Sequence, residues 1–114
     1  IVERYRKCLQ GIEGICLCRE QTGVKSNYAY FPVVFNGYKN TRDEVFEKLK
    51  EENIIARKYF YPLTNNFTCY KDLPTAGTEK TPVAEYIAAK VLTLPLYVGL
   101  DFEDVDKICR IILN

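Results

Sequence analysis

The chain has 114 residues, of which 47% are hydrophobic and 27% are charged, as is typical of one globular domain. Its formal net charge of +1 argues against the basic surface that nucleic-acid binding usually needs, so we expect no nucleic-acid partner. No apolar run reaches the roughly 18 residues of a membrane span, and charged residues interrupt any N-terminal signal pattern.

The first predicted element is a helix over residues 1–12. Its apolar side chains recur with the period of one helix face, at Val2, Tyr5, Leu9 and Ile12. The chain opens inside this helix and contains no methionine. We therefore expect it to be a fragment of a longer protein.

The five cysteines are spread along the chain at Cys8, Cys16, Cys18, Cys69 and Cys109. An odd number without a signal peptide favours free thiols in a reducing cytoplasm, so the predicted localisation is cytoplasmic. The spacing of Cys16 and Cys18 does not suit zinc, and the chain has no histidine. We expect no metal site.

Two strands are predicted next, a short one over residues 16–19 and a longer one over residues 28–35, separated by a polar loop over 20–27. Pro32 cannot donate a hydrogen bond, so the longer strand should lie at an edge or have one unpaired side. Both of its faces are apolar, which predicts a covering layer on each.

A helix over residues 42–52 should follow. Thr41 and Glu44 have the spacing of a capping box, and Asn53 suits a left-handed stop. Its inward residues are expected to be Val45, Phe46 and Leu49.

Beyond this helix we predict a strand over 54–61, an irregular connection over 64–81 and a helix over 82–90 capped by Thr81. This helix is expected to bury Val83, Ile87 and Val91. A strand over 91–94 and a last helix complete the chain. The inward residues of the last helix are Val105, Ile108, Cys109 and Ile112. The predicted fold is a single α+β domain over residues 1–114, with a three- to four-stranded sheet and helices mainly on one face.

Binding is the chemistry that the residues favour, because the sequence holds no Ser-His or Cys-His pair and no glycine-rich phosphate loop. Arg57 and Lys58 are adjacent on a predicted strand, so only one of them can face a given ligand. Tyr59, Phe60 and Tyr61 can stack on a ring or line a pocket. The alternative is an ordinary strand with solvent-facing cations and core aromatics.

At these residues the chain resembles the C-terminal small domain of the DegT/StrS-type sugar aminotransferases. The resemblance runs through residues 4–5, 28–35, 42–44 and 53–63, then Tyr70, Pro82, residues 84–85 and 91–97, and the amphipathic helix that closes the chain. It implies a pyridoxal-phosphate enzyme that aminates a nucleotide-linked keto-deoxysugar, with glutamate as the amino donor and a homodimer as the working unit. The catalytic lysine and the cofactor phosphate site would lie in a large N-terminal domain outside this chain. No cofactor and no activity are therefore expected of the fragment alone.

The resemblance also implies that this region shapes the substrate pocket. The substrate-binding residues that follow are Arg57, Tyr59, Phe60, Tyr61 and Thr64. Thr64 stands where many members of the family have histidine, which leaves its sugar contact open.

The alternative function is a free-standing α+β ligand-binding or regulatory module. Tyr28, Tyr30 and Phe31 superficially resemble the base-stacking strand of an RNA-recognition domain. The near-zero net charge and the absence of a Gly-Phe signature argue against an RNA-binding module.

Overall fold

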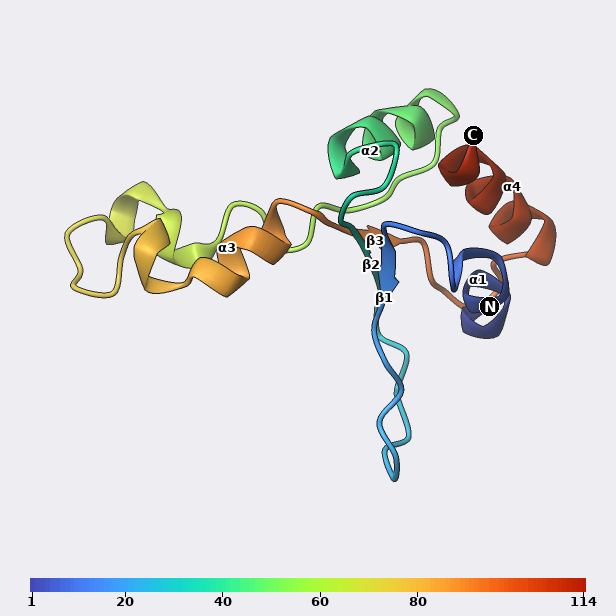
Figure 1. Cartoon of the computed structure of the whole chain (residues 1–114), viewed down its shortest axis with the longest axis horizontal. Coiled ribbons are helices and arrows are strands. Elements are labelled where there is room, and N and C mark those ends of the chain that lie inside the picture. Colours follow the sequence, from blue (N-terminus) through green and yellow to red (C-terminus); the bar gives the residue numbers. More distant parts are fainter.

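The computed structural model describes residues 1–114, and its sheet has three antiparallel strands in the order β1-β2-β3 (Figure 1). The strands are β1 (Ile15–Leu17), β2 (Phe31–Phe35) and β3 (Val91–Leu94). A single bridge between Arg57 and Thr93 adds a short pairing on the other side of β3. The predicted α+β class and the small sheet are confirmed.

Three helices pack on one face of this sheet: α1 (Val2–Leu9), α2 (Arg42–Glu51) and α4 (Phe102–Leu113). The sheet and these helices, here called the body, enclose one apolar core. Its fully buried side chains are Tyr5, Leu9, Val33, Val45, Leu49, Leu92, Leu94, Val105 and Ile112. On the other face of the sheet Pro32 and Val34 are half-buried, whereas their partners Thr93 and Val91 in β3 are buried. The layer expected on this face of β2 is therefore only partial.

Pro32 lies in the central strand of the sheet, not at an edge. It stands opposite Thr93, whose backbone amide and carbonyl bond to Arg57 and therefore point away from β2. The backbone of Pro32 correspondingly faces the β1 side, where β1 ends at Leu17 opposite Val33. No strand residue stands beside Pro32 on that side, so its lack of an N–H group leaves no acceptor without a donor. Proline is tolerated because this side of the strand is unpaired, as the second alternative of the prediction stated.

Residues close in the sequence determine where helix α2 begins and ends, as predicted. The capping box at Thr41 is complete: its hydroxyl accepts from the Glu44 amide at 3.3 Å, and its amide donates to the Glu44 carboxylate at 2.6 Å. Asn53 is left-handed, with φ of +58°. Helix α1 ends at Leu9, earlier than predicted, because the backbone turns extended at Gln10.

The predicted strand over 54–61 was wrong, because only Arg57 pairs with the sheet. The chain then leaves the body as the long arm (residues 58–90), seen from yellow-green to orange in Figure 1. The arm contains three 3-10 turns and α3 (Pro82–Ala88). The 3-10 turns are Thr64–Asn66, Thr68–Tyr70 and Thr78–Lys80. No helix of the structure has the length and apolar character needed to cross a membrane.

Helix α3 does not bury the residues predicted for it. Val83 is 76% exposed and Ile87 is 38% exposed, whereas Val91, at the start of β3, is buried as expected. The reason is position: α3 lies on the arm, away from the core (Figure 1). Thr81 makes no side-chain cap, because its hydroxyl accepts from the Asn65 amide group.

A second extension, the short arm (residues 18–30), joins β1 to β2 and contains no helix or strand. Every residue in it is exposed. The predicted strand over 28–35 therefore begins only at Phe31, and Tyr28 adopts a left-handed backbone with φ of +50°.

Candidate functional site

The two arms meet where they leave the body, in a group of aromatic rings. Tyr59 lies against Tyr30 of the short arm with ring centroids 4.6 Å apart, and against Phe60 at 4.0 Å. Tyr61 follows directly in the chain. We call Tyr30, Tyr59, Phe60 and Tyr61 the aromatic cluster. The sequence placed three of them in one strand, but the structure places them at a junction of two loops.

The cluster is partly covered and partly open to solvent. Phe60 is 65% exposed and Tyr61 is 56% exposed, while Tyr59 is half-buried between its neighbours. Partial desolvation, and then the nearby hydroxyl of Tyr30, raise the pKa of Tyr59, so its hydroxyl stays protonated at neutral pH. The cluster therefore offers flat apolar rings with hydroxyl donors at their edges, a surface that suits a planar or sugar ligand.

The two adjacent cations have different roles. Lys58 Nζ lies 2.6 Å from an Asp43 carboxylate oxygen and 4.6 Å from the centroid of the Phe46 ring. Arg57 is held by its backbone, which exchanges hydrogen bonds of 3.0 and 2.8 Å with Thr93. Its side chain is exposed. Arg57 is thus the cation of the pair that is free for a ligand, and a guanidinium suits a phosphate.

Arg42, at the first position of α2, lies beneath the cluster with only 3% of its surface exposed. Its Nη1 donates to the carbonyls of Ala88 at 3.0 Å and Val91 at 3.3 Å. Its Nε lies 2.8 Å from Asp43 Oδ1, in an ion pair whose angle does not make a hydrogen bond. Its guanidinium carbon is 5.0 Å from the centroid of the Tyr61 ring, a cation–π distance.

Thr64 lies further along the long arm, at the start of a 3-10 turn, and is exposed. The amides beside it hold the arm together. Asn65 donates to the Gly77 carbonyl at 3.0 Å, and Asn66 donates to the Glu85 carboxylate at 2.8 Å. The four other predicted residues, Arg57, Tyr59, Phe60 and Tyr61, lie near the base of the arm, where the ring contacts are, whereas Thr64 takes part in none of these ring contacts.

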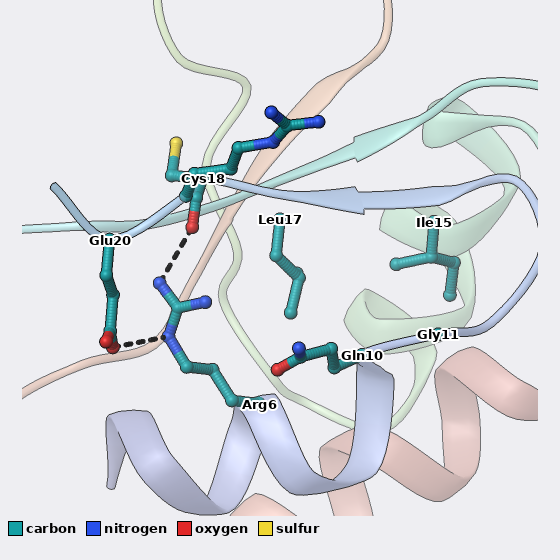
Figure 2. A pocket seen from close by; sticks show the side chains of 8 residues that line it. Arg6, Gln10, Gly11, Ile15, Leu17, Cys18 and Glu20 are labelled. Atoms are coloured by element: carbon teal, nitrogen blue, oxygen red, sulfur yellow. Dashed lines mark hydrogen bonds and ion pairs between the residues drawn. The ribbon is translucent and has the colours of Figure 1, made fainter.

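The base of the short arm is held by Arg6 of α1, as Figure 2 shows. Its Nη2 donates to the Cys18 carbonyl at 2.8 Å, and its Nε lies 3.3 Å from Glu20. Arg6 borders a hollow of about 390 Å³ and a neighbouring one of about 820 Å³. Neither hollow includes any of the five predicted site residues, although Tyr30 lines the larger one.

Pyridoxal phosphate, which the resemblance implies, needs a lysine in a desolvated setting and a cradle for its phosphate. No lysine of this chain is buried, and Lys58 is closed off by Asp43. The residues present do not fit the cofactor.

Sequence reasoning missed Tyr30, Arg42 and Asp43. Tyr30 was assigned to a strand and the other two to a helix start. One signal for Arg42 was available, since a cation in the first helical turn opposes the helix dipole.

The model of the DegT/DnrJ/EryC1/StrS aminotransferase family matches residues 1–113. The dTDP-4-amino-4,6-dideoxy-D-glucose transaminase of Escherichia coli is 42% identical over 96% of this chain, and its counterpart in Shigella dysenteriae is 37% identical over 91%. The chain spans 30% and 28% of the lengths of these relatives.

Solved structures agree with the sequence matches. DesI, determined in the presence of its TDP-sugar product, superposes with a TM-score of 0.83 at 26% identity, covering 97% of this chain and 28% of DesI. An aminotransferase from Brucella abortus superposes with a TM-score of 0.77 at 24% identity, covering 98% and 28%, and supports the fold alone.

Proposed function

Because the chain belongs to the DegT/DnrJ/EryC1/StrS aminotransferase family, we propose that it is the C-terminal region of a pyridoxal-phosphate-dependent sugar aminotransferase. The proposed acceptor is a keto-deoxysugar carried on a nucleotide, and the proposed donor is glutamate. The names of the two relatives, both dTDP-4-amino-4,6-dideoxy-D-glucose transaminases, support a dTDP-linked sugar. The intact enzyme is proposed to act as a homodimer.

In this proposal the chain binds and orients the substrate, while the cofactor, held by the rest of the enzyme, supplies the electron sink for amino transfer. The observation that carries the proposal is the aromatic cluster, which stays open to solvent although its members pack against one another. Phe60 would stack on a ring of the nucleotide-sugar, and Arg57 would pair with its phosphates. The absence of a buried lysine supports a cofactor site outside this chain.

Phe60→Ala tests this role in the complete aminotransferase that contains the chain. We expect the KM for dTDP-4-amino-4,6-dideoxy-D-glucose, with 2-oxoglutarate as amino acceptor, to rise about tenfold, since stacking of a ring on a base contributes about 1–3 kcal/mol. The KM for 2-oxoglutarate should stay unchanged, because that substrate lacks a nucleotide.

Phe102→Ala is the matched control. Phe102 is 61% exposed, close to the value for Phe60, but it lies on α4 of the body. An equal rise in both variants, or no rise with Phe60→Ala, would refute the proposed role of the cluster.

A further inference from the structure

Arg42 is a charged side chain in a position that does not favour charge. It is 97% buried, and removal of a guanidinium from water is costly unless partners replace the solvent. It also occupies the first position of α2, where the helix dipole disfavours a cation. Neither the core nor the helix therefore accounts for an arginine here.

Its contacts instead converge on the two ends of the long arm. At the end of the arm, Nη1 binds the carbonyl of Ala88, the last residue of α3, together with the carbonyl of Val91 in β3. A cation is favourable at a helix C-terminus, where carbonyls lack helical partners. One guanidinium nitrogen thus ties α3 to the sheet.

At the start of the arm the same guanidinium meets the Tyr61 ring, 5.0 Å from its centroid. Asp43 extends the connection, because one carboxylate oxygen lies 2.8 Å from Arg42 Nε and 2.6 Å from Lys58 Nζ. Lys58 immediately precedes the aromatic cluster. Lys58, and then Arg42, hold the pKa of Asp43 below its usual range, so the link is ionised at neutral pH.

We propose that Arg42 is a positioning residue: through Ala88, Val91, Tyr61 and the Asp43–Lys58 pair it fixes both ends of the long arm and so orients the aromatic cluster toward the nucleotide-sugar. This inference rests on the proposed function. Arg42 itself touches no substrate in this view. It acts by restricting the orientations of Tyr61 and of the neighbouring aromatic side chains.

The test is Arg42→Met in the complete aminotransferase, compared with Lys50→Met. Methionine keeps an apolar stem of similar length but removes every polar contact. Lys50 is an exposed cation of the same helix, and its ammonium pairs with Glu47. We expect Arg42→Met to raise the KM for the dTDP-amino sugar about tenfold, since small misplacements of binding groups have effects of this size or larger. The KM for 2-oxoglutarate should stay within about twofold in both variants.

A merely structural role gives a different pattern, because partial unfolding lowers kcat for every substrate and leaves KM unchanged. Arg42→Lys should restore part of the loss, to a KM about threefold above the parent, because an ammonium can pair with Asp43 but cannot also hold two carbonyls and stack on Tyr61. Hydrogen exchange should quicken at residues 58–63 and 88–91 in Arg42→Met but not in Lys50→Met.

A sugar KM within twofold of the parent in folded Arg42→Met overturns the proposal. If that variant does not fold, Asp43→Asn decides, because Asp43 is 61% exposed and its loss frees Lys58. A sugar KM raised about threefold in Asp43→Asn supports the proposal, and an unchanged KM refutes it. When Phe60→Ala raises the sugar KM and the Arg42 and Asp43 variants do not, only the positioning role fails. When Phe60→Ala has no effect either, the proposed function fails with it.

Discussion

Helices α4 and α3 use apolar side chains in opposite ways. Helix α4 buries four of them in the core of the body: Val105, Ile108, Cys109 and Ile112. Helix α3 buries only Ala88 and leaves Val83, Tyr86 and Ile87 exposed. Burial of apolar side chains therefore stabilises the body. The long arm is held by polar contacts at its base, and several of its apolar side chains stay exposed to solvent. Stability and the candidate site are located in different regions.

Two leucine truncations test this contrast most strongly. Leu92 in β3 has 0% exposure, whereas Leu73 on the long arm is 52% exposed. We expect Leu92→Ala to lower the free energy of unfolding by about 2–5 kcal/mol, because it removes buried surface and leaves a cavity. Leu73→Ala should change it by less than about 0.5 kcal/mol. Urea unfolding of the chain measures both, and similar losses would mean that the arm has a core of its own.

A pair of glycines should show a smaller difference. Gly14 and Gly23 share a φ of +78°, which strains any residue with a Cβ. A Cβ at Gly14 would also collide with the backbone of Tyr38, whereas none of the surrounding atoms comes within 4 Å at Gly23 in the short arm.

We therefore expect Gly14→Ala to destabilise the chain by at least about 2 kcal/mol and Gly23→Ala by about 1 kcal/mol, because overpacking adds to backbone strain only at Gly14. Thermal unfolding followed by circular dichroism compares them. Equal shifts of Tm would show that the contact between Gly14 and Tyr38 is not rigid.

The smallest effect concerns pH. Arg4 of α1 donates to Asp106 of α4 at 2.7 Å, and this contact lowers the pKa of the Asp106 carboxyl. The pair then stabilises the body above about pH 4, the usual aspartate pKa, and this contribution disappears as the pH falls through the lowered pKa.

Asp106→Asn should therefore reduce the loss of stability between about pH 5 and pH 2. Asp72→Asn, which removes an exposed carboxylate of the long arm, should leave that loss unchanged. Urea midpoints across this range test the difference. If stability still falls steeply at acid pH in Asp106→Asn, other carboxylates must cause that loss of stability.

The sequence predicted the body better than the arm, for a physical reason. Capping at Thr41, the left-handed stop at Asn53 and the apolar period of α4 depend on neighbours within a few residues, so they can be recognised without tertiary information. The central position of Pro32 depends on where a different strand ends, which no local pattern records.

The candidate site was predicted only in part. The aromatic run from Tyr59 to Tyr61 was found by its composition, but its partner Tyr30 arrives from the other arm. Burial of Arg42 is a tertiary property, because its acceptors Ala88 and Val91 lie far along the chain. The apolar period of α3 indicated a buried face, yet this chain supplies nothing to cover it.

The pairing of Arg57 with Thr93 has a consequence for how this region could diversify. The chain leaves the sheet and returns to it at points joined by two backbone hydrogen bonds, so the intervening residues form a detour with fixed ends. The entropic cost of closing such a loop increases only slowly with its length. The part of the long arm beyond these anchored ends can therefore change in length and sequence at little cost, while the framework that carries it remains the same.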